Sequence, residues 1–330
     1  VDAYKDSFSM DDTSKGYVKL SKAVAREMQK KAKNLGKKID LKGVLETTFA
    51  EADWIQAVPM LSKWNSNVLN KKTGLLPELA NIKGNFYSGF TWKRSDKELF
   101  KEVMGGGTTL TRSISRLNKK HGKLPPYWVT EYGVMVQKSN PTKILLERAK
   151  DYQAGLSVAD ILISSINAGF GGAYAFNLAE EGTWGMLANN TDYRLRPSGL
   201  AFSMVSKLAG TKLLPVKLAG VTDVSISGGK GNNPSGMKYP SLVAMGGKDK
   251  NGLQLVVLNR SYDVDTELTV NLEGSSAKSA KIYQLGHYSP KASNDKKAGK
   301  VVIKSRTLKG MGSKHVLKVP ARTLMRVVYK

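Results

Sequence analysis

The chain has 330 residues, of which 41% are hydrophobic, and five tryptophans, a composition typical of a folded globular protein and not of a disordered one. Fifty-two lysines and arginines face 27 aspartates and glutamates, so the formal net charge is +25. The absence of cysteine excludes disulfides and thiolate metal sites, and no run of about 18 apolar residues offers a membrane-spanning helix. The charge predicts an anionic partner: an acidic polysaccharide, a cell surface or nucleic acid.

The first two thirds of the chain alternate between helical and strand patterns. The first predicted helix spans about residues 16–35 and packs through one apolar face, formed by Tyr17, Leu20, Val24, Met28 and Leu35. Strand and helix patterns then alternate at 42–49, 54–68, 81–92, 99–117, 127–134, 142–167, 173–178 and 197–208. The triplet Gly105-Gly106-Gly107 predicts an interruption in the helical pattern around it.

Strict alternation of helices and strands predicts parallel strands joined by right-handed crossovers. Four such strands make half of a (β/α)8 TIM barrel, which we place in residues 1–209. After about residue 210, period-two apolar runs predict an antiparallel β-sandwich over 210–330. Its strands are expected at 241–245, 253–258, 267–272, 281–285, 301–304, 315–319 and 324–329.

One acidic residue follows a strongly apolar strand pattern. Residues 127–130 are Tyr, Trp, Val and Thr, all strand formers, and the strand is expected to run out at Glu131, before the glycine at 133. A carboxylate held by a sheet but facing open space has the geometry of a catalytic nucleophile. The alternative is an ordinary ion pair with one of the many lysines.

Three segments resemble the seventh and eighth strand regions of clan A retaining glycoside hydrolases. They are Trp128-Val129-Thr130-Glu131-Tyr132-Gly133, the helix containing 152–160, and Gly172-Ala173-Tyr174-Ala175-Phe176. The resemblance is to the groups of α-L-arabinofuranosidases, β-xylosidases and heparanase-like β-glucuronidases. Residues 255–261 and 316–325 are similar to the sandwich that follows the barrel in those enzymes.

The resemblance implies a retaining glycosidase with Glu131 as the nucleophile and a second carboxylate about 5 to 5.5 Å away as the acid/base. In the family the acid/base follows the fourth strand in an Asn-Glu pair, and no such pair occurs before the first helix. Counting strands makes 42–49 the fifth. We therefore expect a companion chain or segment to supply strands one to four and the acid/base. Glu46 is a weaker alternative acid.

Further substrate-binding candidates lie around the expected strand ends. Aromatic rings suit the apolar face of a sugar, although each could equally be core packing. Basic side chains could bind a carboxylate or sulfate, although ordinary basic surface is the competing interpretation. The predicted set is Trp92, Lys93, Arg94, Tyr132, Phe176, Asn177, Trp184 and Tyr193.

The predicted function is a secreted, periplasmic or cell-surface glycoside hydrolase acting on an acidic polysaccharide. The alternative is a non-catalytic polysaccharide-binding or surface protein on the same scaffold. Nucleic-acid binding rests on net charge alone, without a recognised module. Since His121, His287 and His315 are scattered, we expect neither metal nor cofactor.

Overall fold

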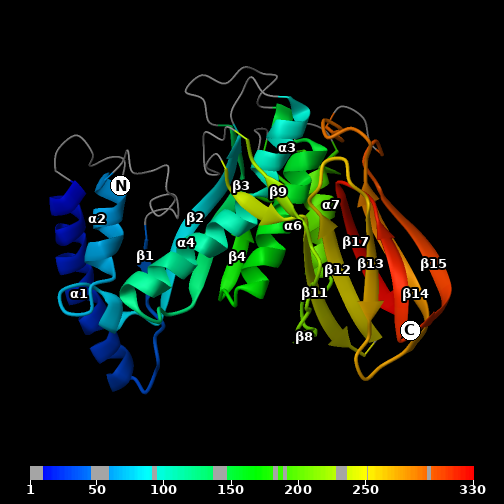
Figure 1. Ribbon diagram of the computed structural model, residues 1–330. Coiled ribbons are helices and arrows are strands. Elements are labelled where there is room, and N and C mark those ends of the chain that lie inside the picture. Colours follow the sequence, from blue (N-terminus) through cyan, green and yellow to red (C-terminus); the bar gives the residue numbers. More distant parts are fainter. Residues whose placement is uncertain are drawn as a thin grey trace. The chain divides into compact units, whose positions relative to one another are not determined.

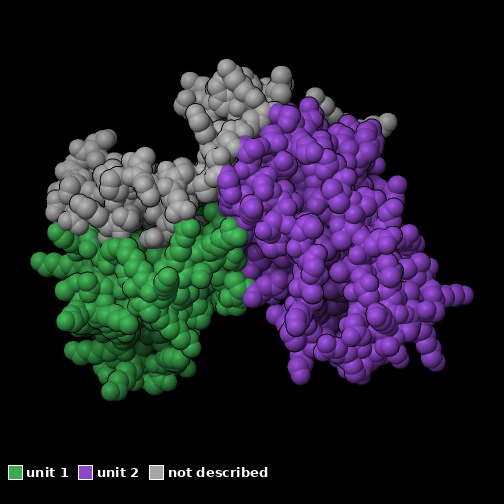
Figure 2. Space-filling model, viewed as in Figure 1, with its two compact units in different colours: residues 1–86, 109–131, 168–174 green, residues 87–108, 132–167, 175–330 purple. Residues whose placement is uncertain are grey.

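The computed structural model describes residues 10–45, 59–90, 95–136, 147–180, 185–188, 192–227, 236–250, 252–295 and 299–330. The chain divides into two compact units (Figure 2). Unit 1 comprises residues 1–86, 109–131 and 168–174, and unit 2 comprises 87–108, 132–167 and 175–330. None of the helices described in these ranges is long and apolar enough to cross a membrane.

Unit 1 begins with two helices that lie side by side, α1 (Met10–Asn34) and α2 (Pro59–Val68) (Figure 1). The ring of Tyr17 stacks on Trp64, with centroids 4.9 Å apart. Arg26 Nη2 reaches Glu78 Oε1 at 3.1 Å, which ties α1 to the short 3-10 helix η4 (Leu76–Glu78).

The helix predicted at the start of the chain exists, but the face expected to be buried is largely the wrong one. Leu20 is 69% exposed, Val24 49%, Met28 44% and Leu35 73%. The buried side carries Ser14, Val18 and Ala25 instead. Ser14 Oγ accepts from Asn67 Nδ2 at 2.8 Å, so this buried side faces α2.

A four-stranded sheet has the order β1-β2-β3-β4, formed by β1 (Lys42–Val44), β2 (Asn81–Phe90), β3 (Tyr127–Val136) and β4 (Gly172–Ala175). β1 and β2 pair in parallel. Gly171 N–H donates to the Tyr127 carbonyl and Phe176 N–H to the Tyr132 carbonyl, both at 2.9 Å. Both strands advance in the same direction between these bonds, so β3 and β4 are also parallel, as predicted.

The predicted helix interruption is confirmed. α3 (Asp96–Met104) stops at Gly105 and α4 (Gly106–His121) begins at the next residue. Gly107 N–H donates to Asp160 Oδ2 at 2.8 Å, and a Cβ at Gly107 would lie 2.4 Å from Ser164 Oγ. A glycine is therefore required here so that the start of α4 can approach α6 (Tyr152–Asn167).

Helix α6 forms the centre of unit 2. All its side chains from Tyr152 to Ser165 are buried, and it packs against α3, α7 (Pro197–Ser206) and strands of the C-terminal sheet. Asp160 Oδ1 accepts from Arg260 Nη1 at 2.8 Å, with both side chains buried. Burial raises the pKa of the Asp160 carboxyl, while Arg260 and the Gly107 N–H act in the opposite direction.

The C-terminal strands form a six-stranded sheet of order β15-β14-β17-β12-β11-β8, and a two-stranded sheet of β13 and β16. The neighbouring strands of both sheets pair in antiparallel fashion. Their bounds are β8 (Lys212–Leu214), β11 (Leu242–Asp249), β12 (Gly252–Asn259), β13 (Thr266–Asn271), β14 (Ala277–Gly286), β15 (Ile303–Gly312), β16 (Lys314–Val319) and β17 (Thr323–Tyr329). Leu317 and Val319 of β16 share one hydrophobic core with residues of the larger sheet.

All seven strands expected after residue 240 are confirmed, with longer bounds in several cases. Three more were not predicted: β8, β9 (Asp223–Ser225) and β10 (Lys238–Pro240). Each has three residues, too few for a period-two pattern to emerge. The fold therefore combines a parallel sheet and its helices with antiparallel β-sheets, and this combination was predicted from the sequence.

Candidate active site

Glu131 lies within β3 and not at its end, because the strand continues to Val136. The expectation that the strand runs out at this carboxylate is therefore wrong. Tyr127 and Val129 are buried, whereas Trp128 and Thr130 are partly exposed, as in a regular strand with one covered face. Glu131 is also partly exposed, so the alternation breaks there.

Two hydrogen bonds to the β4 segment bracket this position. Gly171 N–H donates to the Tyr127 carbonyl and Phe176 N–H to the Tyr132 carbonyl. They are five residues apart on each strand, whereas a regular parallel pair repeats every two residues, so the pairing is irregular between them. Glu131 lies in this interval, and its side chain is partly exposed.

One face of the sheet in unit 1 carries polar and aromatic groups from all four strands. Trp128 Nε1 donates to Asn81 Oδ1 and Thr130 Oγ1 to Asn85 Oδ1, both at 2.8 Å. The Tyr174 ring, 55% exposed, stacks on Trp128 with centroids 5.9 Å apart. We call this surface the aromatic face.

The aromatic face also has a cation. Lys42 Nζ lies 4.5 Å from the Trp128 ring centroid, in cation–π geometry. Sequence reasoning named none of these side chains as site residues. The signal was present in β2, where Asn81, Lys83 and Asn85 alternate with buried Ile82 and Phe86. Chemically, an exposed ring flanked by amides and an ammonium group can stack on a sugar and hydrogen-bond its hydroxyls.

In unit 2, the structure places Tyr132 and Phe176 together through the backbone bond already described. Tyr132 is fully buried, and burial raises the pKa of its phenol well above the usual value. Phe176 is partly exposed and meets Tyr87 edge-on, at 6.5 Å between centroids. The Tyr132 ring therefore packs in the core, while Phe176 keeps an accessible edge.

Asn177 follows Phe176 across a cis peptide bond. Its carbonyl accepts from Met186 N–H at 3.0 Å, which begins a three-stranded sheet of β5 (Ala179–Glu180), β6 (Leu187–Ala188) and β7 (Arg194–Leu195). Tyr193 is 61% exposed and adopts φ 53°, a left-handed conformation that few non-glycine residues take.

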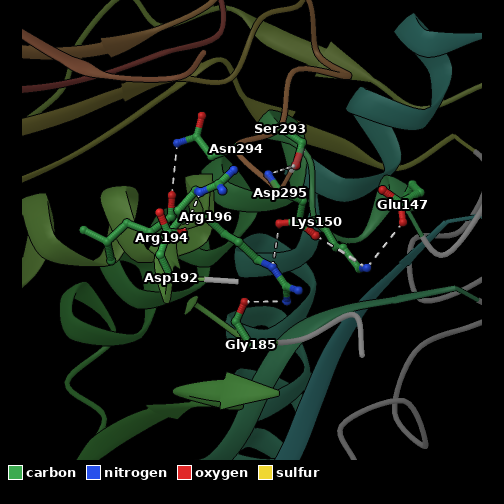
Figure 3. Close-up of polar contacts among 10 residues, drawn as sticks. Glu147, Lys150, Gly185, Asp192, Arg194, Arg196, Ser293, Asn294 and Asp295 are labelled. Carbon is green, nitrogen blue, oxygen red and sulfur yellow. Dashed lines mark hydrogen bonds and ion pairs between the residues drawn. The ribbon is translucent and has the colours of Figure 1, made fainter. Parts of the chain in front are cut away.

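A buried polar network holds this segment in place (Figure 3). Arg196 Nη1 donates to the Gly185 carbonyl at 3.0 Å and Arg196 Nε to Asp295 Oδ1 at 2.8 Å. Lys150 Nζ lies 3.5 Å from the other oxygen of Asp295. The side-chain amide of Asn294 donates to the Leu195 carbonyl at 3.0 Å. These contacts hold residues 185, 195 and 196, which follow Asn177 in the chain.

The remaining predicted site residues, Glu46, Trp92, Lys93, Arg94 and Trp184, lie outside the described residues. The loop at 228–233 also lies outside them. Within the described ranges, no group of three or more histidines, aspartates or glutamates is arranged to hold a metal ion.

The comparisons with known proteins concern the fold. No protein-family model and no curated protein sequence matches the chain. Among solved structures, a family 51 α-L-arabinofuranosidase from Bifidobacterium longum superposes with a TM-score of 0.69 and 13% identity, covering 96% of this chain and 63% of its own. The GH51 arabinofuranosidase from Xanthomonas axonopodis pv. citri superposes with a TM-score of 0.66 and 13% identity, covering 89% of this chain and 59% of its own.

The thermostable GH51 α-L-arabinofuranosidase from Thermotoga petrophila gives a TM-score of 0.64 and 17% identity, covering 98% of this chain and 63% of its own. This chain thus spans about 60% of the length of these enzymes. The comparisons confirm the resemblance in fold to clan A glycoside hydrolases, with their TIM-barrel-like architecture.

Proposed function

We propose that the chain is part of a retaining glycoside hydrolase, in which residues 1–209 form strands five to eight of a TIM barrel and 210–330 form a β-sandwich. The observation that carries the proposal is the position of Glu131. It lies on the third strand of the parallel sheet, off the buried face, in a fold like that of arabinofuranosidases. In the proposed barrel this strand is the seventh.

The chemistry requires two carboxylates. In the first step a Glu131 oxygen bonds to the anomeric carbon as the glycosidic C–O bond breaks, and the acid/base protonates the leaving oxygen. In the second step the same group removes a proton from water, which attacks the anomeric carbon and releases Glu131. We assign the acid/base to the companion segment that supplies strands one to four.

The other predicted residues complete the site. Phe176 and Tyr193 would offer ring surfaces to the sugar, Asn177 an amide, and Tyr132 would hold Phe176 through its backbone. Trp92, Trp184, Lys93 and Arg94 keep their proposed roles in substrate binding. No metal or cofactor enters the proposal.

The test is Glu131→Gln in the assembled enzyme, with Glu273→Gln on an exposed turn as the matched control. Aryl arabinofuranosides, xylosides and glucuronides are the substrates. We expect at least a thousandfold loss of kcat for Glu131→Gln and none for the control. A 2-fluoro glycosyl fluoride should label the peptide that contains Glu131 in the wild type, as seen by mass spectrometry. Undiminished turnover by Glu131→Gln refutes the assignment.

The net charge of +25 supports an acidic polysaccharide as substrate and a location outside the cytoplasm, in secreted, periplasmic or cell-surface form. Affinity for polygalacturonate or a sulfated glycan should exceed that for neutral arabinan and fall steeply with added salt. Equal affinity for the two polymers at low salt contradicts this part of the proposal.

A non-catalytic polysaccharide-binding or surface protein is the second candidate, and the aromatic face favours it. Its stacked rings and amides bind sugars without any catalytic carboxylate. Tyr174→Ala should then weaken glycan binding about tenfold, while Glu131→Gln leaves binding unchanged and no turnover is seen in the wild type. Retention of anomeric configuration in a turnover product decides for the hydrolase.

A further inference from the structure

About half of the net positive charge lies in the C-terminal stretch 274–330. These residues include eleven lysines and three arginines against one aspartate, so they hold +13 of the net charge of +25. That aspartate, Asp295, is buried and paired with Arg196. The stretch therefore places many cations and no acidic side chain on the surface.

Several of these cations share one face of the six-stranded sheet. On β14, Tyr283 lies directly opposite Ser305 of β15 and Arg326 of β17. Lys281, two residues earlier on β14, lies opposite Thr307. Because side chains alternate along a strand, these residues point to one side, away from the hydrophobic core on the other. We call this side the basic face, and it consists of Lys281, Tyr283, Ser305, Thr307, Lys309 and Arg326.

The basic face is open to solvent and is not neutralised. The residues that flank Tyr283 on β14 and β15 are exposed, namely Lys281, Ser305, Thr307 and Lys309. In the C-terminal stretch, Lys318 pairs with Asp265 on another sheet. Among the described residues, however, no ion pair involves a cation of the basic face. These cations are therefore available to an anionic ligand.

The guanidinium of Arg326 is held in a fixed orientation. Its Nε donates to Gln254 Oε1 at 3.0 Å, and Gln254 Nε2 donates to Asp249 Oδ2 at 2.9 Å. Its Cζ lies 4.9 Å from the centroid of the Tyr283 ring, and Lys281 Nζ lies 5.2 Å from the same centroid. Within the described residues, the two terminal amino groups of the guanidinium make no hydrogen bond. They form the fork that binds a carboxylate or sulfate through two parallel hydrogen bonds.

Lysine on an edge strand has a second explanation. β15 is the edge of the six-stranded sheet (Figure 1), and charged side chains on an edge strand prevent pairing with other sheets. That explanation accounts for Lys309. It does not account for Lys281 and Arg326, which lie on β14 and β17 inside the sheet. A binding site accounts for all three cations.

The shape of the basic face favours an acidic polysaccharide over nucleic acid. A two-stranded β-ribbon can enter the major groove of DNA, but β14 is paired with β17 as well as β15 and so belongs to a broad sheet. Single-stranded nucleic acid stacks its bases on aromatic rings, and the Tyr283 ring already contacts two cations. The hydroxyls of Ser305 and Thr307 beside the cations suit the hydroxyl groups of a sugar.

We propose that the basic face is a non-catalytic binding site for an acidic polysaccharide. Arg326 binds one carboxylate or sulfate group, Lys281 and Lys309 bind neighbouring acidic groups, and the two hydroxyl side chains bind sugar hydroxyls. The site goes beyond the proposed function, because it takes no part in bond cleavage. Glu131 belongs to unit 1, whereas the basic face belongs to unit 2.

The test measures binding of the full chain to short oligosaccharides by calorimetry at low salt. The probes are an oligogalacturonate for carboxylates, a sulfated dextran oligomer for sulfates and the unsulfated oligomer as the neutral reference. The variant is Lys281→Gln/Lys309→Gln. The matched control, Lys19→Gln/Lys30→Gln, removes the same charge from exposed positions of α1. We expect at least tenfold weaker binding of an acidic probe by the variant and less than a twofold change in the control.

A third variant tests geometry at constant charge. Arg326→Lys keeps the cation and removes the planar fork, so we expect about fivefold weaker binding of the acidic probe. Circular dichroism and thermal unfolding should show the variants folded, and the double variant decides alone if Arg326→Lys does not fold. Equal losses in the double variant and the control would assign binding to net charge and overturn the site.

Hydrogen exchange locates the bound ligand. The acidic probe should slow exchange at the backbone amides of β15 in the wild type and not in Lys281→Gln/Lys309→Gln. Unchanged exchange in β15, or no binding of either acidic probe, would overturn the proposal. So would tighter binding of an oligonucleotide of equal charge that the double variant weakens, or binding only to phosphatidylglycerol vesicles, because the occupant is then nucleic acid or a membrane surface.

This proposal and the proposed function can fail separately. Protection of β15 is measured without turnover, and turnover of a small aryl glycoside should be unchanged in Lys281→Gln/Lys309→Gln. Protection of β15 without any Glu131-dependent turnover supports the binding site and counts against the hydrolase. Glu131-dependent turnover without protection of β15 supports the hydrolase and counts against the binding site.

Discussion

Helices α1 and α6 differ in composition and in how much of their surface is covered: α1 is rich in lysine, whereas α6 has no lysine or arginine. α6 is buried on all sides by α3, α7 and the C-terminal sheet (Figure 1), including polar residues such as Gln153 and Asp160. α1 is covered on one side by α2 and η4, while Leu20 and Val24 stay exposed. The difference shows that apolar residues on a helix do not by themselves decide burial. Burial also depends on which other elements of the fold pack against that side of the helix.

The polar residues of α6 make the contrast sharper. The Asp160 carboxylate is tolerated inside unit 2 because it accepts hydrogen bonds from Arg260 Nη1 and from the Gly107 N–H. On α1, the charged side chains Lys22 and Arg26 reach Glu78, whose own side chain is only 8% exposed while that of Arg26 is 64% exposed. The ion pairs of α1 therefore stay in contact with water on the cationic side, whereas the Asp160–Arg260 pair is buried on both sides.

The largest expected effect comes from breaking the ion pair of α6. Asp160→Asn leaves the buried Arg260 charge without its counter-charge and should lower the free energy of unfolding by about 3–5 kcal/mol. Chemical denaturation measures this. The control Asp263→Asn removes an ion pair with Lys97 that is exposed on both sides and should change it by less than about 1 kcal/mol. Equal effects at the two sites would contradict the contrast.

A glycine in each helix gives the next test. A Cβ at Gly155 of α6 would lie 2.6 Å from the backbone carbon of Pro197 in α7, whereas at Gly16 of α1 it meets nothing within 4 Å. Gly155→Ala should destabilise by about 3 kcal/mol, because backbone atoms must move. Gly16→Ala should stabilise by up to about 1 kcal/mol through helix propensity. Thermal unfolding of the two variants should move in opposite directions.

A valine pair tests burial with one chemical change. Val158→Ala in α6 removes buried methyl groups and should destabilise by about 2 kcal/mol. Val24→Ala in α1 removes exposed ones and should be neutral or stabilise by up to about 0.5 kcal/mol, since alanine is the better helix former. A loss of stability above about 1 kcal/mol for Val24→Ala would mean that the side of α1 with Leu20, Val24 and Met28 is already covered within this chain.

The smallest effect concerns a surface carboxylate. The Ala321 N–H donates to Asp265 at 3.0 Å and Lys318 lies beside it, which lowers the pKa of Asp265. A lowered pKa in the folded state means that the group stabilises the fold above its unfolded pKa of about 3.9 and loses that contribution as the pH falls through its folded pKa. Asp265→Asn should cost below about 0.5 kcal/mol at pH 7, and the difference from wild type should shrink as the pH falls below about 3.9 and vanish once the carboxyl is protonated in the folded state. A difference that persists in acid would assign the effect to shape and not to charge.

The order and type of the elements followed from the sequence to a large extent. Period-two runs such as 253–258 and 324–329 predicted β12 and β17, because a strand with one covered face alternates whatever its partner is. The triplet at 105–107 predicted the break between α3 and α4, because glycine ends helices for local reasons. The strands β8, β9 and β10 were missed, because a run of three residues is too short to show a period-two pattern.

The candidate site was less predictable. The strand pattern around Glu131 marked the residue, but the pattern predicted that the strand ends there, whereas β3 continues to Val136. The stack of Trp128 on Tyr174 and the Arg196 network join residues far apart in the sequence. Each needs a partner that only the fold brings near.

The sequence by itself determined the alternation of helices and strands, the switch to antiparallel strands and the basic charge, because these depend on local propensity, periodicity and composition. Tertiary structure decided which face of α1 is covered, how Glu131 is turned and which buried charges meet, because each of these depends on distances between segments remote in the chain. Leu20 shows the division plainly: its spacing came from the sequence, and its exposure came from the neighbours that α1 has in the fold.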